Sequence, residues 1–488
     1  MNIVPVIFED HNLVRMRPVA WSTPVFEMRC GMFSTRERVG LCAGGGRGVL
    51  LGRGMLRNLN NASGWEWGAA ATGKGDRFLF LNGMLAPDFS LVQGLLELAQ
   101  DSPDFVWRNG QELVAALLGG ELARQIAGDW EAWEKGNASQ GVWTDPAQTP
   151  RTWAGEGLLP GEAVLHLAGG GEVQVDPDAT GAAQELVAKL GELEQLQMAA
   201  PQWIWDIVGC TQEALTGDLA FVKDGRSFRR EPFGIFPHPD HPAPEWLLET
   251  TLETLASRMK ADVVSRLLVE ASDQVFCGEN VHLAPGTALN SDQGPIILDR
   301  GVRVMPQCYL EGPLYIGPGS LVKPGTRIHG ESSFGIVNRL AGEIGESTFG
   351  DFANKQHEGF IGHAVVGSWI NLGAMTTCSD LKNNYGDIRV DLGSGIVATG
   401  KRFIGLMMGD HAKTAIGVLF NTGTCVGFAS NIFGAGMPPK FVGNFQWGGQ
   451  EGCPRYTVDR ARDTAAVVMQ RRGCLFTDAH GELFTALG

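Results

Sequence analysis

Aliphatic residues return at every sixth position in the second half of the chain. The series runs through Ile316, Val322 and Ile328, and later through Met408, Thr414, Phe420, Val426 and Ile432. Neither an α-helix, with 3.6 residues per turn, nor a strand, with its period of two, produces a step of six. Three short strands of about six residues make one triangular coil, and each coil stacks on the last. The pattern therefore predicts a left-handed parallel β-helix of hexapeptide repeats over residues 275–450.

An insertion interrupts this repeat at residues 379–403, and a helix is expected after the repeat ends. Insertions in solenoids tend to leave from one face and often build a binding site. Residues 458–471 have the pattern of a helix closed by Gly473. We expect residues 454–488 to form a C-terminal helix and tail that cap the open end of the solenoid.

The first 240 residues show a different pattern, typical of an α/β domain. Apolar runs at residues 4–8 and 77–81 end in polar turns and predict buried strands. Helical periods are expected at residues 113–118 and 186–196, so residues 1–240 should form an α/β domain with a mostly parallel sheet. Five prolines within residues 232–244 end it. An apolar stripe from Leu248 to Leu267 then predicts a connecting helix within residues 244–272.

Net charge, cysteine pattern and the lengths of apolar runs exclude some classes of binding partner and indicate a cellular compartment. The net charge of −15 and the pI of about 5.2 argue against nucleic acid or an anionic membrane as the main partner. The nine cysteines form no C-x-x-C pair, which argues against a disulfide framework and a structural zinc site. Acidic residues follow the first strand at once, unlike a signal peptide, and no apolar run reaches about 18 residues. We expect a soluble, cytoplasmic protein.

One stretch of the predicted β-helix resembles a known family. Residues 354–386 read NKQHEGFIGHAVVGSWINLGAMTTCSDLKNNYG. They are similar to the acetyltransferase half of the bifunctional UDP-N-acetylglucosamine pyrophosphorylase/glucosamine-1-phosphate acetyltransferase, and the spacing of fourteen from His357 to Asn371 matches that family without a gap. The chain also resembles a less characterised branch of sugar nucleotidyltransferases with a hexapeptide tail. The shared motifs are FED at residues 8–10, P-V-x-E-x-R-x-G at residues 24–31 and SNIFGAGMPPKFV at residues 430–442.

The resemblance implies an acyl-transfer site with acetyl-CoA as co-substrate. It implies that His357 is the general base, a role suited to an imidazole with a pKa near ~6.5. The candidates for substrate contacts are Asn371, Asp380, Lys382 and Lys355. The resemblance, with one face of the triangular solenoid and the insertion available for packing, also predicts a homotrimer.

Departures from the family pattern leave the chemistry open. The family has Tyr where this chain has Phe360, and Gly where it has Met375; its Cys-Asn-Tyr is replaced by residues 379–381, Ser-Asp-Leu. His363, His411 and His329 raise a further alternative, because hexapeptide β-helices include carbonic anhydrases that bind zinc through three histidines.

For the first half, the resemblance implies a sugar-1-phosphate nucleotidyltransferase fold. Such enzymes cradle a nucleoside triphosphate in a Gly-rich first loop and hold Mg²⁺ with a Gly-Asp at a strand end. Here the first strand runs into acidic Glu9 and Asp10, and Asn82 stands where Asp is expected. The weaker candidates for nucleotide or phosphate contacts are Arg29, Arg36, Lys74 and Asn82. We therefore expect this half to be degenerate.

Three functional hypotheses remain. The first is an enzyme that transfers acetyl from acetyl-CoA to an amino-sugar phosphate or a nucleotide sugar on the β-helix. The second is an active nucleotidyltransferase whose β-helix only trimerises. The third is a non-catalytic trimeric scaffold that binds sugar nucleotides or proteins.

Overall fold

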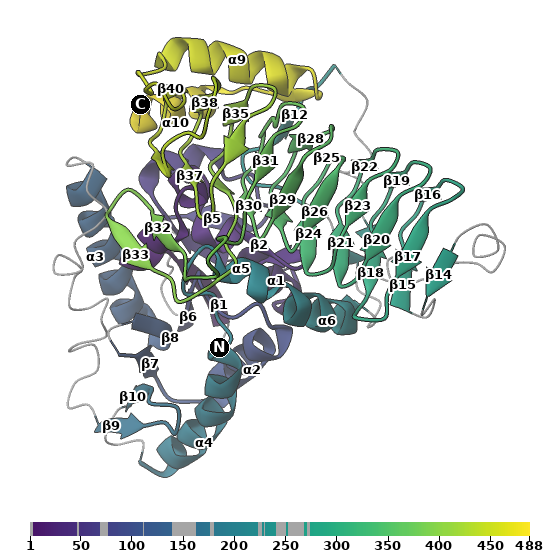
Figure 1. Cartoon of the computed structure of the whole chain (residues 1–488). Helices are drawn as coiled ribbons and strands as arrows, with labels where there is room; N and C mark the ends of the chain where they lie inside the picture. Colours follow the sequence, from purple (N-terminus) through teal and green to yellow (C-terminus); the bar gives the residue numbers. More distant parts are fainter. Residues whose placement is uncertain are drawn as a thin grey trace. The chain divides into compact units, whose positions relative to one another are not determined.

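The computed structural model describes residues 3–45, 48–68, 77–110, 112–138, 163–175, 180–222, 227–228, 230–240, 250–251, 268–270 and 274–488 (Figure 1). The chain divides into two compact units. The first comprises Met1–Val14, Pro24–Glu27 and Ser34–Gln202. The second comprises Arg15–Thr23, Met28–Phe33 and Trp203–Gly488.

The first unit is built on an eight-stranded mixed sheet. Its strand order is β5 (Trp65–Trp67), β4 (Gly48–Leu51), β1 (Ile3–Phe8), β6 (Arg77–Asn82), β8 (Glu112–Gly119), β7 (Phe105–Asn109), β10 (Glu172–Val175) and β9 (Ala163–His166). The pairs from β5 to β6 are parallel, and those from β6 to β9 are antiparallel. The predicted strands at residues 4–8 and 77–81 are confirmed.

In the described residues, four helices complete this α/β unit: α1 (Thr35–Cys42), α2 (Phe89–Asp101), α3 (Gly120–Ala138) and α4 (Thr180–Gln197). Alternate residues of β1 point to opposite faces. Ile7 packs in one cluster with side chains of α1, α2 and α4, whereas Val6 and Phe8 pack in another with α3. The sheet is thus covered on both faces. The unit also contains the 3₁₀ segments η3 (Val25–Glu27) and η4 (Gly54–Leu59).

Of the two helical periods expected in this half, one is confirmed and one is wrong. Residues 186–196 lie in α4, as predicted. Residues 113–118 lie in β8 and are all buried. β8 lies between β6 and β7 and is covered on both faces, so its residues are apolar without alternation. The periodicity of such a run does not distinguish a strand from a buried helix.

The second unit contains the predicted left-handed parallel β-helix. One face is the nine-stranded sheet of β15 (Val275–Cys277), β18 (Ile296–Leu298), β21 (Leu314–Ile316), β24 (Ser332–Phe334), β27 (Thr348–Phe349), β30 (Val365–Val366), β34 (Met407–Met408), β37 (Cys425–Val426) and β39 (Phe441–Val442). The second face comprises β14 (Leu268–Glu270), β17 (Ala288–Asn290), β20 (Tyr309–Glu311), β23 (Arg327–Ile328), β26 (Glu343–Gly345) and β29 (Phe360–Gly362), continued by β31 (Thr377–Cys378) and β36 (Leu419–Phe420). The third face comprises β16 (His282–Leu283), β19 (Arg303–Val304), β22 (Leu321–Val322), β25 (Arg339–Leu340) and β28 (Asn354–Lys355), continued by β35 (Lys413–Thr414), β38 (Asn431–Ile432) and β40 (Trp447–Gly448).

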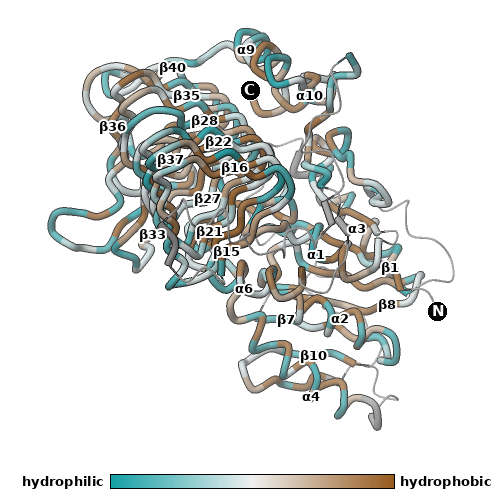
Figure 2. Tube along the Cα trace, turned by 90° about the vertical axis from the view of Figure 1, so that its right-hand side faces the viewer, coloured by the Kyte–Doolittle hydropathy of each residue, from teal (hydrophilic) through white to brown (hydrophobic). Residues whose placement is uncertain are grey.

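The interior of the β-helix explains the period of six. Val322, Ile328, Phe420, Val426 and Ile432 all lie in one buried apolar cluster that follows the axis of the stack. Figure 2 shows the stacked coils, in which apolar positions recur from one coil to the next. Each coil buries one such residue per face, so the solenoid core is a column of aliphatic and aromatic side chains.

The insertion forms an antiparallel hairpin of β32 (Arg389–Asp391) and β33 (Ile396–Ala398). It leaves the coil after Asp380, and a bridge between Leu381 and Phe403 closes its base. Side chains before and within β32 are buried, and those of Ile388 and Val390 face Gly423 of the solenoid. The outer strand is open to solvent, because Ile396 is 70 % exposed.

The chain ends in α9 (Val458–Gln470), β41 (Cys474–Leu475) and α10 (Asp478–Leu487), so the predicted helix after the repeat is confirmed. Ala461 and Phe484 of these helices pack with Phe428 and Phe445 at one corner of the β-helix. β41 also pairs with β12 (Phe236–Pro237). The helices thus cover the last coils (Figure 1).

Several short elements complete the second unit: the 3₁₀ segments η1 (His11–Met16), shared with the first unit, and η2 (Val19–Trp21), the strands β2 (Arg29–Cys30), β11 (Ser227–Phe228) and β13 (Thr250–Thr251), and the helices α5 (Asp206–Gly209) and α6 (Thr211–Val222). β3 (Phe33–Ser34) lies at a boundary between the units. Most of the connecting helix expected in residues 244–272 lies outside the described residues, and the two described stretches, β13 and β14, are strands. None of the helices in the described part of the chain is long and apolar enough to cross a membrane.

Candidate acyl-transfer site

His357 lies on a turn at one corner of the β-helix. Residues 356–359 join β28 to β29, and His357 is exposed. Its imidazole has no hydrogen-bond partner among the described residues. The turn stacks on the next coil, where the Met375 N–H donates to the Glu358 carbonyl at 2.8 Å, and on a third coil, where the Gly417 N–H donates to the Ala374 carbonyl at 2.8 Å. We call residues 356–359, 373–376 and 415–417 the His357 ridge.

Apolar side chains are exposed along this ridge. Met375 is 55 % exposed and Ile416 is 78 % exposed. Leu419 and Phe433, on the coils that continue the ridge, are also exposed. A run of exposed large apolar residues is a sign of a binding surface, whereas a single one needs no explanation.

Asn371 lies on the coil that follows the His357 turn. It forms parallel bridges with Asn354 on one side and Lys413 on the other, and the Asn354 amide donates to Asn371 Oδ1 at 2.6 Å. The spacing of fourteen thus carries the chain about one coil onward, so Asn371 and His357 lie on neighbouring coils. Lys413 Nζ donates to the His411 carbonyl at 2.7 Å, and burial lowers the Lys413 pKa to about 8. These residues form a ladder of polar groups that leads toward the ridge.

Lys355, expected to contact substrate, points into the solenoid. It pairs with Leu340 in the stack of interior positions that also contains Val322, and it is 2 % exposed. Its ammonium donates to the Ala341 carbonyl at 2.7 Å and to the His357 carbonyl at 3.1 Å. Burial lowers its pKa to about 8. An ammonium bonded to these carbonyls and closed off from solvent does not reach a ligand on the surface.

Asp380 and Lys382 lie at the other end of the β29–β31 face from His357. Asp380 Oδ2 is 2.8 Å from His363 Nδ1, and Phe403, at the end of the insertion, stacks on the His363 ring with centroids 5.0 Å apart. Lys382 Nζ donates to the Asp387 carbonyl within the insertion. Within one chain, the structure therefore groups His357 with Asn371 but places Asp380 and Lys382 at a different corner.

Carboxylates and imidazoles alternate along that second corner. Glu311 Oε2 is 3.2 Å from His329 Nδ1, and Glu346 Oε2 is 3.8 Å from His363 Nδ1. Burial raises the pKa of Glu346, and the neighbouring His363 and His329 act in the opposite direction. The sequence gives each of these residues but not their alignment, because the coils between them contain different numbers of residues.

The third histidine of the zinc alternative has a different environment. His411 is buried at the corner covered by α10, where its ring stacks with Trp369 and meets Phe428 and Phe484 edge to face. Its Nδ1 is buried without a hydrogen-bond partner, and burial holds its pKa well below the usual value. In the residues that the structure describes, no group of three metal-ligating side chains comes together.

The end of β1 in the first unit is closed by polar contacts within the chain. Glu9 forms an ion pair with Arg53 at 2.9 Å, fully buried, and also accepts the Val25 N–H at 3.0 Å. The Asn82 amide donates to Asp10 Oδ2 at 2.9 Å and to the Leu113 carbonyl at 2.9 Å. A turn of this kind disfavours a triphosphate, because paired carboxylates stand where the phosphates would need backbone N–H donors.

A magnesium site is not supported at this edge. Mg²⁺ in proteins is held by carboxylates together with substrate phosphates. Here the Asp10 carboxylate accepts hydrogen bonds from the Asn82 amide at 2.9 Å and from the Asn12 N–H at 2.8 Å, so its oxygens are engaged within the chain. The residues present do not fit the metal, so no step through it follows.

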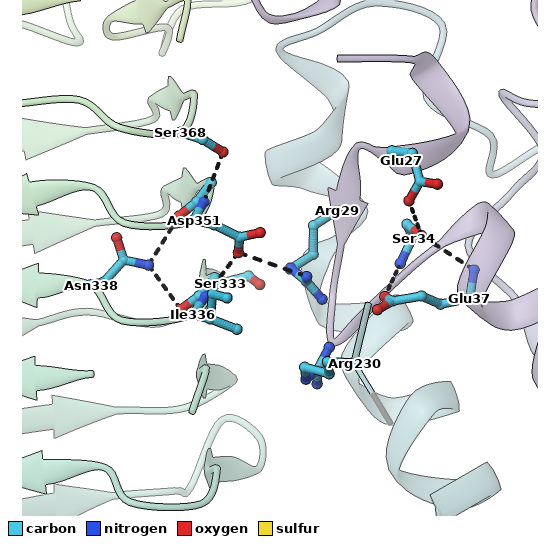
Figure 3. A network of polar contacts seen from close by, with 12 residues as sticks. Glu27, Arg29, Ser34, Glu37, Arg230, Ser333, Ile336, Asn338, Asp351 and Ser368 are labelled. Carbon is cyan, nitrogen blue, oxygen red and sulfur yellow. Dashed lines mark hydrogen bonds and ion pairs between the residues drawn. The ribbon is translucent and has the colours of Figure 1, made fainter. Parts of the chain in front are cut away.

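The remaining phosphate candidates are engaged or outside the described residues. Arg36 pairs with Glu27, and both side chains are buried. Lys74 lies outside the described residues. Arg29 belongs to the second unit, where it donates to the Met32 carbonyl and lies 3.9 Å from Asp351 of the β-helix (Figure 3).

Residues on either side of Arg29 also pack within the second unit. Ser22 and Thr23 donate to buried Asp410 at 2.6 and 2.9 Å. Ser333 Oγ donates to the Gly31 carbonyl at 2.6 Å. Gly31 has φ +72°, and a Cβ there would lie 2.6 Å from an Asp218 oxygen, so only glycine fits. We call residues 15–23 and 28–33 the strap; part of the P-V-x-E-x-R-x-G motif thus serves packing on the β-helix.

Comparison with known proteins agrees with this architecture. Residues 5–142 match the model of a family described as sugar nucleotidyl transferase. A bifunctional sugar-1-phosphate nucleotidylyltransferase/acetyltransferase from Sulfurisphaera tokodaii is 25 % identical over 127 residues, which are 26 % of this chain and 31 % of that protein. The bifunctional protein GlmU of Ruthia magnifica subsp. Calyptogena magnifica is 31 % identical over 108 residues, which are 22 % of this chain and 23 % of that protein. The matched stretches span less than a third of either relative. Residues 5–142 therefore match the sugar nucleotidyl transferase family, and the chain resembles the bifunctional nucleotidyltransferase/acetyltransferases of the GlmU type.

Proposed function

We propose that the β-helix transfers an acetyl group from acetyl-CoA to the amine of an amino-sugar phosphate or a nucleotide sugar. The observation that carries this proposal is the exposed imidazole of His357 on the ridge, one coil from Asn371. Both similar proteins are named as bifunctional, and the name of one of them includes acetyltransferase.

The chemistry needs a base and an orienting polar group. The acceptor amine attacks the thioester carbonyl, a C–N bond forms, the C–S bond breaks and CoA leaves as a thiolate, which then takes up the proton that the base has removed from the amine. His357 accepts the proton that the amine loses, a step for which an imidazole is suited near neutral pH. The ladder of Asn354, Asn371 and Lys413 supplies amide and ammonium groups for the acceptor. Asp380 and Lys382 reach this site from a neighbouring subunit or serve the insertion alone.

The ridge and the insertion support a homotrimer. Met375 and Ile416 are exposed on the ridge, and the outer strand β33 of the insertion exposes Ile396. A threefold assembly would let one subunit cover the apolar ridge of the next and bring the corner of Asp380 to a neighbour's His357. We also propose a cytoplasmic location, because the nine cysteines have no C-x-x-C pair or other pattern of a disulfide framework.

The first unit is proposed to be a degenerate nucleotidyltransferase. The Glu9–Arg53 pair and the Asn82–Asp10 hydrogen bond stand where a triphosphate and its metal would need a donor-rich loop and carboxylates. We expect no pyrophosphate-releasing turnover from UTP or dTTP with a hexose 1-phosphate. Turnover in the range of roughly 1–10³ s⁻¹, usual for enzymes, would contradict this and favour the hypothesis that the β-helix only trimerises.

A non-catalytic scaffold is the second candidate, and one observation favours it. The His357 ring has no orienting partner among the described residues, and Phe360 and Met375 replace the family's Tyr and Gly. An assay with acetyl-CoA and a panel of amino-sugar phosphates, followed by thiol release, separates the two. Acetyl-CoA-dependent thiol release with one acceptor supports the enzyme, whereas a thermal shift by sugar nucleotides without any release supports the scaffold.

A further inference from the structure

Lys355 occupies a position that the fold reserves for apolar side chains. Along the third face, the interior positions before it are Val304, Val322 and Leu340, and Leu372 follows it on the next coil. Lysine is almost never fully buried unless it is paired with an opposite charge. Among the described residues, its ammonium donates to two backbone carbonyls and pairs with no carboxylate. Burying an ammonium group at this position costs free energy. We therefore expect Lys355 to have a role that an aliphatic residue could not perform.

The carbonyls that Lys355 binds define that role. One belongs to Ala341 on the preceding coil, and the other belongs to His357 on the turn that carries the candidate base. The ammonium therefore ties the turn to the wall of the solenoid from inside. Hydrogen bonds from a charged donor are roughly twice as strong as neutral ones. The side chain holds the His357 backbone while its own end stays out of the substrate's reach.

We infer that Lys355 is a positioning residue, which fixes the His357 turn through hydrogen bonds from its buried ammonium to the carbonyls of His357 and Ala341. The inference deepens the proposed acyl transfer and rests on His357 as its base. Misplacement of a reacting group by about 1 Å can cost on the order of 10²-fold in rate. Lys355→Met keeps the length and volume of the stem and removes only the ammonium.

The titration of Lys355 supplies a signature that a purely structural residue would not give. Burial lowers its pKa to about 8, with Glu358 on its own turn acting upward and Arg327 of β23 acting downward. Leu340 and Leu372, the interior neighbours, carry no charge. As pH rises through about 8, the ammonium loses its charge and its hydrogen bonds to the two carbonyls weaken. Acyl transfer should therefore decline above pH 8 in the wild type. Because burial also lowers the pKa of Lys413 to about 8, this alkaline limb should be shallower in Lys355→Met than in the wild type rather than absent.

The test compares wild type, Lys355→Met and Val322→Ala, an interior substitution two coils away that perturbs packing but not the turn. We expect Lys355→Met to lower kcat about 10²-fold with KM for acetyl-CoA unchanged and the melting temperature no lower than that of the wild type. Val322→Ala should lower the melting temperature and keep both kcat and the alkaline limb. An unchanged kcat in Lys355→Met, or an alkaline limb as steep as that of the wild type, overturns the inference.

A second measurement does not depend on activity and separates this inference from the proposed function. Hydrogen exchange of a peptide spanning residues 352–360, measured by mass spectrometry, should be faster in Lys355→Met than in wild type after correction for intrinsic rates. In the wild type, the protection should fall between pH 7 and 9. If acyl transfer is absent from the wild type but these shifts occur, the proposed function fails and the positioning of the turn stands. Equal exchange in both proteins overturns the positioning role.

Discussion

At the scale of single residues, the site rests on two kinds of histidine. His357 is exposed on the ridge, and its proposed role depends on a free imidazole. His411 is buried among aromatic rings, and its Nδ1 has no hydrogen-bond partner. One histidine is therefore available to a substrate and the other is part of the core. Each of them leads to a separate prediction.

Replacing His357 by Gln should lower kcat for acyl transfer by roughly 10²–10⁴-fold, the usual contribution of a general base. The amide is similar in size but does not accept a proton, so acetyl-CoA binding and oligomeric state should not change. His282→Gln, an exposed histidine of β16, is the matched control and should keep full activity. Steady-state kinetics and calorimetry measure both. A loss of melting temperature with activity spared would assign His357 a structural role instead.

Acid should destabilise the fold through His411. Burial holds its folded-state pKa well below the usual value of 6.5, and Lys413 and His480 act in the same direction. The unfolded chain therefore takes up a proton below about pH 6.5 that the folded chain does not. The contribution of His411 to the free energy of unfolding is fully present above pH 6.5, and it falls by up to about 1.4 kcal/mol per pH unit below that value. Urea unfolding at pH 7 and pH 5 should show a smaller difference in His411→Phe than in the wild type. An identical difference in both would place the titrating group elsewhere.

At the scale of elements, the strap is joined to the β-helix by buried polar contacts. Asp410 accepts hydrogen bonds from Ser22, Thr23 and the Ser368 N–H, and it is almost fully buried. Asp410→Ala leaves two hydroxyls and one N–H without their acceptor. Each buried group left unsatisfied costs about 1–3 kcal/mol. The free energy of unfolding should fall by at least that much, whereas Asp463→Ala on the exposed side of α9 should change it by less than about 0.5 kcal/mol. A neutral Asp410→Ala would mean that water replaces the carboxylate.

The difference between what the sequence predicts and what it misses is also clearest at this scale. The β-helix, the insertion and α9 follow from periods and breaks that are local in the chain. The strap depends on contacts across hundreds of residues, such as Thr23 with Asp410, and no local pattern signals them. The family resemblance implies that Lys355 contacts substrate, but only the register with Leu340 shows that its side chain points inward. The Glu346–His363 alignment requires the coil lengths, which the period of six does not fix when turns vary.

At the scale of the whole molecule, the prediction concerns assembly. Ile416 is 78 % exposed on the ridge, and burying such a side chain is worth about 1.5–3 kcal/mol. In a threefold ring the same loss recurs at every interface, so one substitution acts three times on the trimer. Ile416→Asp should therefore shift sedimentation at micromolar concentration from trimer toward monomer and leave the far-UV spectrum unchanged. Val467→Asp, at an exposed apolar position of α9 away from the ridge, should leave the trimer intact. A wild type that sediments as a monomer would contradict the trimer, and a trimer that survives Ile416→Asp would move the interface to another face.

If Ile416→Asp gives folded monomers that also lose acyl transfer, the site is completed by a neighbouring subunit. Activity in those monomers would instead show that His357 and Asn371 of one chain are enough.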